Sequence, residues 1–384
     1  MFFLVTAVMS ALLLGVVYLW GVDVSPWLAR HRRAFALGLV ALFLLQRATR
    51  WSEVHWHVGQ PLETLLIGVL MTLAIGAVPI GIMRLASWVV RRAMRGRKEA
   101  DLAPAGITRR QMIEGASGTA LLGATGSMMG WGIARGRLAF EVHEVAVRIP
   151  GLPRVLDGYT LVQVSDIHTG LYVGERELDE GLSLARAAKP DLLVVTGDLV
   201  DLESKYAPLI ARKLADIAPP DGVWACLGNH DYYAGASAVG DHLRAAGVNL
   251  LVNDGRILRE RDGGGFALLG VDDQWSARYG APGARLDLAT SRVRPEAPRI
   301  LLSHQPPTVE HWAGQVALQL SGHTHGGQIN PLGLRPADLF YRYVAGLYQV
   351  RGTALYVNRG FGTVGPPARA WAPPEITRIV LVAS

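Results

Sequence analysis

The sequence contains very little cysteine, and Cys226 is the one thiol in 384 residues. A single cysteine excludes an intrachain disulfide, so cysteine usage does not reveal the redox compartment. The sequence also lacks internal repeats and long low-complexity segments, which excludes a repeat architecture. No charged stretch precedes the first apolar segment, which argues against a cleaved signal peptide. A chain of this length has room for one large domain and a second part.

Positive charge is in slight excess, with a formal net charge of +6, and half of the residues are hydrophobic. A basic chain can bind nucleic acid, but here the arginines crowd between apolar segments in the first third of the chain. That arrangement is typical of the flanks of membrane helices. We therefore expect a lipid bilayer as a partner and no nucleic acid.

The apolar excess falls in segments that are long enough, or nearly so, to span a membrane. They lie at about residues 1–22, 34–48, 64–90 and 115–133. The first and third have the length that a transmembrane helix needs, with Pro79 tolerated as a kink. The second is either a marginal span or a helix on the membrane surface, and the fourth is rich in Gly and Ala. We predict a membrane region over residues 1–134 with three to four transmembrane helices.

Basic residues between these segments predict the orientation of the chain. They form two groups: Arg30, Arg32 and Arg33, and then Arg91, Arg92, Arg95, Arg97, Lys98, Arg109 and Arg110. Positively charged loops stay on the cytoplasmic side, so the part after Ile133 is expected outside the cytoplasm if the short second segment crosses. The sequence therefore predicts a multi-pass protein of the bacterial inner membrane with an extracytoplasmic C-terminal domain.

Residues 108–113 read Thr-Arg-Arg-Gln-Met-Ile and precede the fourth apolar segment. They resemble a twin-arginine export signal placed inside the chain, which would make export machinery a partner. They fit equally well as two further cytoplasmic charges. Both interpretations place the C-terminal domain on the far side of the membrane.

From about residue 138 to residue 384 the pattern changes to short apolar runs separated by Gly, Pro and Asp. The runs that read as buried strands are residues 160–164, 192–196, 222–227, 266–271, 300–303, 316–321 and 355–358. Helical patterns lie between several of them, for example at residues 174–188 and 209–217. Strands that alternate with helices predict an α/β domain.

Polar residues follow five of these predicted strands at the point where each strand ends. They are Asp166 and His168; Asp198; Asn229, His230 and Asp231; His304; and His323 and His325. Ligand sites of open α/β sheets form at the carboxyl ends of strands. Side chains two residues apart in an extended chain point the same way, so His323 and His325 are expected to face one pocket.

Each of these motifs also has an ordinary structural explanation. Gly197-Asp198 is a common turn, Asn229 can adopt a left-handed turn conformation, and a lone His304 is more often structural. Their conjunction favours a metal site, since two Asp, one Asn and four His suit Mn, Fe or Zn better than Ca or Mg. These ligands are too many for one ion. We therefore expect two divalent metal ions that share a carboxylate, with Mg as a further candidate metal.

The five motifs, in this order, resemble the blocks of the calcineurin-like metallophosphoesterases over residues 138–384. Further stretches are similar to a membrane-anchored bacterial branch of that family: Gly326-Gly327-Gln328, Gly346-Leu347-Tyr348, residues 356–363 and residues 374–377. The resemblance implies a four-layer α/β/β/α sandwich of two mixed sheets flanked by helices. Asp231 stands where many relatives have Glu.

The resemblance also implies which residues hold each ion. Asp166, His168 and His325 would bind the first ion, and Asn229, His304 and His323 the second. Asp198 would bridge both ions.

The expected function is that of a membrane-anchored phosphodiesterase acting on a phospholipid, a lipid-linked or another phosphoester. A hydroxide that bridges the metals would attack phosphorus in line. His230 would protonate the leaving group, oriented by Asp231, which is also placed to cap a helix. The alternative is a membrane sensor or scaffold that uses this fold as a binding module, although the presence of Asp198 and His230 argues against it. A metal-dependent hydrolase of a non-phosphate bond is the third hypothesis.

The sequence says least about substrate binding. Arg359 is expected either to meet a phosphate oxygen or to pair with a core carboxylate, and Asn358 beside it is a further substrate candidate. Tyr341, Tyr343 and Trp371 fit a lipid-facing rim or ordinary packing, and packing is favoured.

Overall fold

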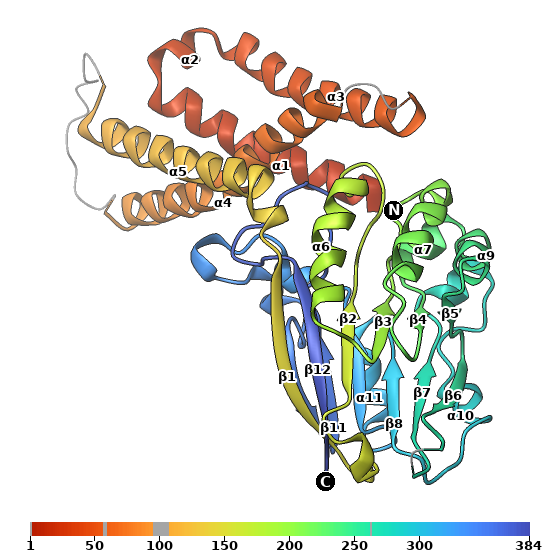
Figure 1. Ribbon diagram of the computed structural model, residues 1–384. Coiled ribbons are helices and arrows are strands. Elements are labelled where there is room, and N and C mark those ends of the chain that lie inside the picture. The colour runs from red at the N-terminus through yellow and green to blue at the C-terminus, as the bar shows by residue number, and fades with distance from the viewer. Residues whose placement is uncertain (1, 57–59, 95–106, 262) are drawn as a thin grey trace. The chain divides into compact units, whose positions relative to one another are not determined.

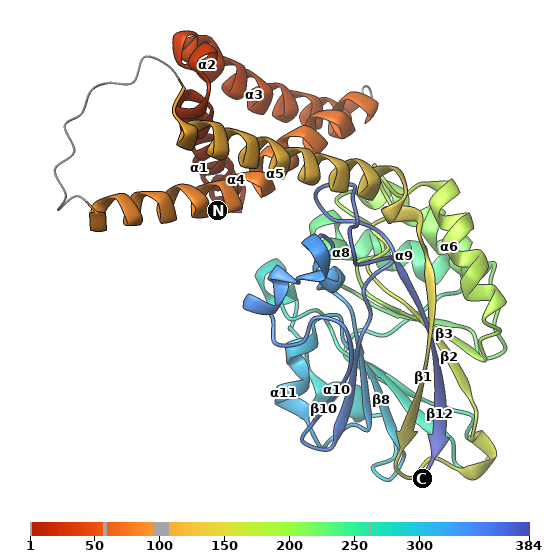
Figure 2. The ribbon, with the colours of Figure 1, turned by 90° about the vertical axis from the view of Figure 1, so that its left-hand side faces the viewer.

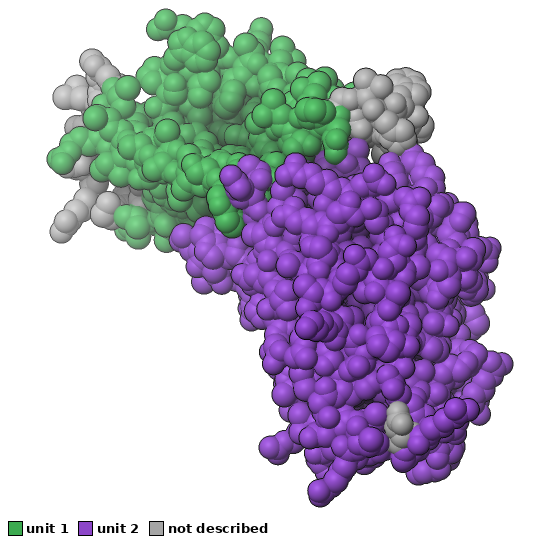
Figure 3. Space-filling model, in the orientation of Figure 1, with its two compact units in different colours: residues 1–133 green, residues 134–384 purple. Residues whose placement is uncertain are grey.

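The computed structural model describes residues 2–56, 60–94, 107–261 and 263–384, shown from two sides in Figure 1 and Figure 2. The chain divides into two compact units, residues 1–133 and residues 134–384 (Figure 3). The boundary agrees with the place where the sequence changes from long to short apolar runs.

The described residues of the first unit are mostly helical. Its helices are α1 (Phe2–Val24), α2 (Pro26–Arg30), α3 (Arg32–Trp56), α4 (Gln60–Met94) and α5 (Arg109–Ala134). Among the described residues, the one helix long and apolar enough to cross a membrane is Gln60–Val90, and Val8–Val24 is a shorter apolar helix. Pro79 lies inside α4, as expected. Part of the predicted basic loop, residues 95–98, lies outside the described residues, and the number of spans stays a prediction.

The twin-arginine-like stretch forms the start of α5. The Thr108 hydroxyl accepts a hydrogen bond from the Gln111 amide at 3.2 Å, which is the contact of an N-cap. Arg110 lies 3.4 Å from the Asp23 carboxylate, which Arg84 also contacts at 3.2 Å. Arg110 therefore has a partner inside the unit. Its role as an export signal stays a prediction.

The second unit contains two six-stranded sheets. The first has the order β1-β12-β2-β3-β4-β5. Its strands are β1 (Glu141–Ile149), β12 (Glu375–Ala383), β2 (Thr160–Val164), β3 (Leu192–Thr196), β4 (Val223–Cys226) and β5 (Asn249–Leu250). β12 is antiparallel to β2, whereas β2, β3, β4 and β5 run parallel. The sheet is therefore mixed.

The second sheet has the order β10-β11-β9-β8-β7-β6. Its strands are β10 (Gly346–Val350), β11 (Thr353–Val357), β9 (Leu318–Ser321), β8 (Arg299–Leu302), β7 (Phe266–Gly270) and β6 (Asp254–Leu258). The four inner strands are parallel, and the edge strands β10 and β6 are antiparallel to their neighbours. The seven apolar runs predicted as strands correspond to β2, β3, β4, β7, β8, β9 and β11.

The two sheets face each other over one apolar core, and helices cover their outer faces (Figure 1). Leu161, Val194, Leu268, Leu302 and Leu320 are buried in the core between the sheets. The remaining helices are α6 (Glu175–Ala187), α7 (Ala207–Ala215), α8 (Asn229–Ala234), α9 (Ala236–Ala245), α10 (Leu286–Thr290) and α11 (Val309–Trp312). Strands buried on both faces read as continuous apolar runs, which explains the pattern of the sequence. The predicted α/β/β/α sandwich is confirmed.

Short 3₁₀ helices connect the larger elements. They are η1 (Gly136–Leu138), η2 (Arg154–Leu156), η3 (Ser204–Tyr206), η4 (Ser276–Tyr279), η5 (Pro306–Thr308), η6 (His325–Gly327), η7 (Pro331–Gly333) and η8 (Pro336–Leu339). Three of them, η6, η7 and η8, fall between β9 and β10, and η6 begins at the predicted ligand His325.

Candidate metal centre and active site

The polar residues predicted at the strand ends meet at one edge of the two sheets. They form three groups in which one ligand atom of each residue lies within 4.8 Å of the others. The groups are Asp166, His168 and His325; His168, Asp198 and His230; and Asp198, His304 and His323. These residues follow β2, β3 and β4 of the first sheet and β8 and β9 of the second. The site therefore forms only when the two sheets pack against each other.

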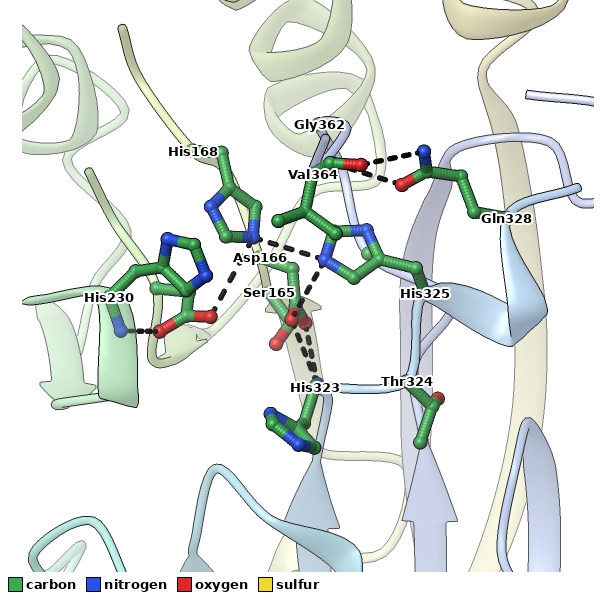
Figure 4. A network of polar contacts seen from close by, with 12 residues as sticks. Ser165, Asp166, His168, His230, His323, Thr324, His325, Gln328, Gly362 and Val364 are labelled. Atoms are coloured by element: carbon green, nitrogen blue, oxygen red, sulfur yellow. Dashed lines mark hydrogen bonds and ion pairs between the residues drawn. The ribbon is translucent and has the colours of Figure 1, made fainter. Parts of the chain in front are cut away.

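In the first group the Nε2 atoms of His168 and His325 lie 3.0 Å apart, and His325 Nε2 lies 3.5 Å from Asp166 Oδ1 (Figure 4). Two imidazole nitrogens that face each other beside a carboxylate form a donor set for a cation. The Asp166 carboxylate is fixed from the other side, since it accepts hydrogen bonds from the His323 amide at 2.8 and 3.0 Å. The residues present fit a divalent metal ion.

In the third group, which contains Asp198, His304 and His323, His304 lies at the centre. Its Nε2 atom is 3.2 Å from Asp198 Oδ2, 3.2 Å from Asn229 Oδ1 and 3.2 Å from His323 Nδ1. His304 Nδ1 lies 2.8 Å from the Thr196 carbonyl oxygen, to which it can donate its proton. That contact leaves Nε2 as the nitrogen with a lone pair for a metal. Asn229 therefore lies with the residues predicted to share its ion.

Asp198 connects His168 of the first group with His304 of the third. Its Oδ2 atom lies 3.2 Å from His304 Nε2 and 3.6 Å from His168 Nε2. Its Oδ1 atom accepts a hydrogen bond from the His230 amide at 2.8 Å. One carboxylate oxygen thus lies between a histidine of the first group and a histidine of the third.

The backbone at the site is bent at five of these residues. Asp166, His168, Asp198, His323 and His325 have φ of 51°, 51°, 53°, 73° and 52°. A left-handed conformation costs a residue with a side chain about 1–2 kcal/mol, and such strain concentrates at functional sites. The expectation that residues 323–325 are extended is wrong, although both histidines lie in the predicted site. The bend directs His325 to His168, while the ring of His323 points away from it and joins His304 (Figure 4).

His230 is held by a residue that the sequence analysis missed. Its Nδ1 atom lies 2.9 Å from the Asp201 carbonyl oxygen and 3.1 Å from the Asp201 carboxylate. Burial alone would lower the pKa of His230, but Asp198 and Asp201 outweigh it and raise the pKa to about 9. Asp201 does not directly follow a strand, since it comes after Asp198 in an irregular loop. The pattern of polar residues at strand ends therefore does not identify it.

Asp231 does not orient His230, which corrects the expected contact. Its carboxylate accepts hydrogen bonds from three backbone amides: Gly228 at 2.9 Å, Leu199 at 2.9 Å and Val200 at 3.2 Å. The first is the contact of a residue that caps the start of α8, and the other two hold the loop after β3. Asp231 therefore fixes the loops that carry Asp198 and Asn229.

Burial and neighbouring charges together set the protonation of the candidate ligands. Burial and the nearby His230 lower the pKa of His168 to about 4, and burial and His304 lower that of His323 to about 3. Both rings are thus neutral at neutral pH, which is the form that binds metals. Burial opposes the charge of Asp198, but His304 and His230 hold its pKa well below the ordinary value.

The two substrate candidates have partners inside the protein. Arg359 Nε lies 2.6 Å from the Glu375 carboxylate, and its Nη2 lies 3.0 Å from that of Glu141. Of the two roles expected for Arg359, the structure shows the pairing with a core carboxylate. Asn358 is fully buried, donates to Thr377 at 2.7 Å and accepts from the Gly360 amide at 2.7 Å. These contacts give Asn358 a structural role, which corrects its expected role with substrate.

Arg369 is a second residue that the sequence analysis missed. It is fully buried, and its Nη2 atom lies 3.2 Å from His325 Nδ1. The same guanidinium donates to the carbonyl oxygens of Gly362 and Ala372. Arg369 joins the loop after β11 to the loop of the metal ligands. No spacing in the sequence indicates this contact, because Arg369 stands 44 residues from His325.

The chain is similar to several known proteins. The sequence model of the calcineurin-like phosphoesterases matches residues 159–327. A transmembrane protein with metallophosphoesterase domain from Danio rerio is 32% identical over 97% of this chain and 87% of its own length. The uncharacterized metallophosphoesterase YkuE of Bacillus subtilis is 33% identical over 72% of this chain and 98% of its own length. Among solved structures, the calcineurin-like phosphoesterase YfkN of Bacillus subtilis is similar with a TM-score of 0.36 and 13% identity, over 57% of this chain and 90% of that one.

Proposed function

Because the chain belongs to the calcineurin-like phosphoesterase family, we propose that it uses two divalent metal ions to hydrolyse a phosphodiester at a membrane surface. Membership makes it a metal-dependent phosphoester hydrolase. The observation that carries the two-ion proposal is the position of Asp198, whose Oδ2 atom lies 3.6 Å from His168 and 3.2 Å from His304. The bridging role predicted for Asp198 is compatible with this position.

The two ligand groups would hold the ions as follows. Asp166, His168 and His325 suit one ion, Asn229, His304 and His323 the other, and Asp198 contributes to both. Imidazole, carboxylate and amide oxygen together favour Mn, Fe or Zn, with Mg as a further candidate. When bound, such ions acidify water to supply a nucleophile near neutral pH and offset the negative charge of the phosphate.

His230 is the side chain placed to move a proton. Asp201 engages its Nδ1 atom at 2.9 and 3.1 Å, so Nε2 is the nitrogen left to face the reaction. As the bond between phosphorus and the leaving oxygen breaks, that oxygen gains charge and needs a proton. His230 Nε2 donates it, and Asp201 keeps the ring oriented for the transfer.

We further propose that the protein lies in the bacterial inner membrane as a multi-pass protein with its second unit outside the cytoplasm. Helix Gln60–Val90 is long and apolar enough to cross a bilayer, and the relative from Danio rerio is named a transmembrane protein. Together they indicate membrane association. A phosphoester of a phospholipid or of another lipid-linked molecule is the substrate class that such a position favours.

The test uses the full chain, purified in detergent. Bound metal is measured by elemental analysis, and turnover of an activated phosphodiester is measured with Mn, Fe, Zn or Mg added back. We expect two ions for each chain and metal-dependent turnover, both lost in Asp198→Ala. The matched control is Asp241→Asn on α9, since Asp241 is exposed and contacts Arg244 on the surface. A folded chain that binds less than one ion and stays inactive with every metal would favour the binding-module hypothesis.

A further inference from the structure

The segment that follows the metal ligands carries four large apolar side chains into solvent. Leu332, Leu334, Leu339 and Phe340 are 84%, 71%, 82% and 82% exposed. We call these four residues the apolar tip. Single exposed apolar residues are common, but several within one short segment mark an interaction site. The segment contains η7 and η8 and lies between β9 and β10 in the sequence. It projects from the second unit (Figure 2).

The backbone holds part of this tip in a strained conformation. Leu332 has φ of 55°, which is uncommon for a residue with a branched side chain. Trp371 has φ of 52° and is 54% exposed. Asn330, which comes two residues before Leu332, donates its side-chain amide to the Trp371 carbonyl oxygen at 3.4 Å. Strain that presents apolar groups to solvent is characteristic of a functional surface.

Both ends of the segment are fixed at the metal centre. At the start, the Asn330 side chain donates to the Gly326 carbonyl oxygen at 2.9 Å, directly after His325. At the end, the Tyr341 ring packs edge-on against the ring of His323 at 6.3 Å between centroids. The tip therefore cannot turn inward without disturbing residues that contact or neighbour the candidate ligands.

The residues around the tip have the composition of a membrane interface. Of the three aromatic residues considered as a rim, Tyr343 is buried, whereas Tyr341 and Trp371 are exposed. Arg335 and Arg342 stand beside the tip, and each contacts a carboxylate at the surface. Leucine and phenylalanine with flanking Trp, Tyr and Arg are typical of segments that lie in the lipid headgroup region.

A bilayer suits this tip better than a protein partner. Four side chains offer less area than the roughly 800 Å² that each partner buries in a stable protein complex. The chain itself contains helix Gln60–Val90, which has the length and hydropathy of a membrane span. Such a tether would keep the second unit at a high effective concentration near lipid, so a small apolar contact suffices.

We propose that the apolar tip inserts into the membrane interface and holds the metal centre at the level of the lipid headgroups. Insertion of the tip does not require that the protein hydrolyses a phosphoester. The consequence for the substrate, namely that it is a phosphoester within the membrane, rests on the proposed function.

The experiment places a fluorescent label on the tip. Cys226 is buried, so a cysteine introduced as Phe340→Cys is the reactive one for an environment-sensitive dye. The matched control is Leu288→Cys, which is exposed on α10 at the outer face of the second sheet. Each full-length variant is reconstituted into vesicles of phosphatidylcholine and phosphatidylglycerol, with or without quencher groups on the acyl chains.

We expect blue-shifted emission and strong quenching by the acyl-chain quenchers at position 340, and neither at position 288. Equal, water-like emission at both positions would overturn the proposal. A blue shift that the lipid quenchers leave unchanged and that rises with protein density would also overturn it, in favour of contact with a second copy.

A paired activity measurement tests the consequence. The double variant Leu339→Ser, Phe340→Ser should keep its turnover of a water-soluble diester and lose about tenfold or more on a phosphodiester embedded in vesicles, because apolar burial drives insertion. An equal loss on both substrates would contradict the role of the tip. If the unaltered protein hydrolyses neither substrate, the proposed function fails, while the quenching result still decides insertion.

Discussion

His230 is bounded by Asp201 on one side and by the candidate ligands on the other, with its Nδ1 atom 3.1 Å from the Asp201 carboxylate. In His230→Ala we expect metal content to persist, since the predicted ligands remain. Turnover should fall about 10²–10⁴-fold for a substrate with a poor leaving group, which needs the proton, and little for an activated one. Elemental analysis and kcat across a series of leaving groups provide the measurement.

Asp201→Asn is the companion variant, because it keeps a polar contact at Nδ1 but removes the charge. Its loss should be smaller than that of His230→Ala and should follow the same order of leaving groups. If His230→Ala slows good and poor leaving groups alike, His230 is not the proton donor.

A second residue-scale prediction concerns Asp166 in the metal-free protein. Burial raises the pKa of this carboxyl to about 6. The charge of Asp198 adds to this rise, and the charge of His304 opposes it. Below that pH a metal ion must displace a proton from Asp166, whereas above it the carboxylate is already ionised. Burial lowers the pKa of His304, but Asp198 outweighs burial and raises this pKa well above its ordinary value. His304 must therefore release a proton to a binding metal ion at every pH in the experiment.

The logarithm of the affinity for Mn²⁺ should therefore rise with pH throughout, and its slope should steepen by about one proton below pH 6. Competition with a chelating dye between pH 5 and pH 8 measures this slope. His168 and His323 add nothing in the window, because burial keeps their pKa at about 4 and about 3. A slope that stays constant across pH 6 would contradict the assignment to Asp166.

At the scale of the element, the turn at the end of β9 depends on a residue without a side chain. A Cβ atom at Gly322 would lie 1.9 Å from Ser165 Oγ and 2.0 Å from Asp166 Oδ2. Gly322→Ala must push the end of β2 away and displace the carboxylate. We expect a folded protein with reduced metal content and turnover lowered about 100-fold, since a displacement of about 1 Å in a catalytic site has that effect.

The matched control is Gly174→Ala at the start of α6, where the nearest atom to a new Cβ is Glu177 Oε2 at 3.8 Å. Circular dichroism and elemental analysis of both variants separate loss of the fold from loss of the metal. Full metal content in Gly322→Ala would show that Asp166 does not ligate.

The strands that could be predicted are those buried on both faces. β2, β3, β7 and β11 are buried at every residue, and they read as continuous apolar runs. The edge strands β1 and β10 are half exposed, so their sequences carry no such run. Their place in the sheets is decided by pairing with distant partners, which a local pattern does not contain.

The predicted ligands lie together because each directly follows a strand. The direction of each side chain was not predictable, since the bend at His323 and His325 comes from left-handed backbone and not from an extended chain. Asp201, Arg369 and the partners of Asp231 were missed for a related reason. Their contacts arise between loops, and loops have no period that places a side chain.

At the scale of the whole molecule, the orientation in the membrane can be tested at the C-terminus. β12 ends at Ala383 and Ser384 is exposed, so a fusion there leaves the sheet intact. We expect alkaline phosphatase to be active at this position and a fluorescent protein that folds only in the cytoplasm to stay dark. A fusion after Arg30, in the predicted cytoplasmic loop, should give the opposite pair of results. A bright fluorescent fusion at Ser384 would contradict the outward orientation.

The last strand lies in the middle of the first sheet, between β1 and β2. β12 pairs with β1 from Glu141 opposite Glu375, and with β2 from Thr160 opposite Val380. During synthesis, β1 has no neighbouring strand and β2 has an open edge until the nine residues of β12 leave the ribosome. The second unit therefore completes its fold only after β12 has been synthesised. Any passage of this unit across a membrane must come either wholly before that event, as an unfolded chain, or wholly after it, as a finished domain.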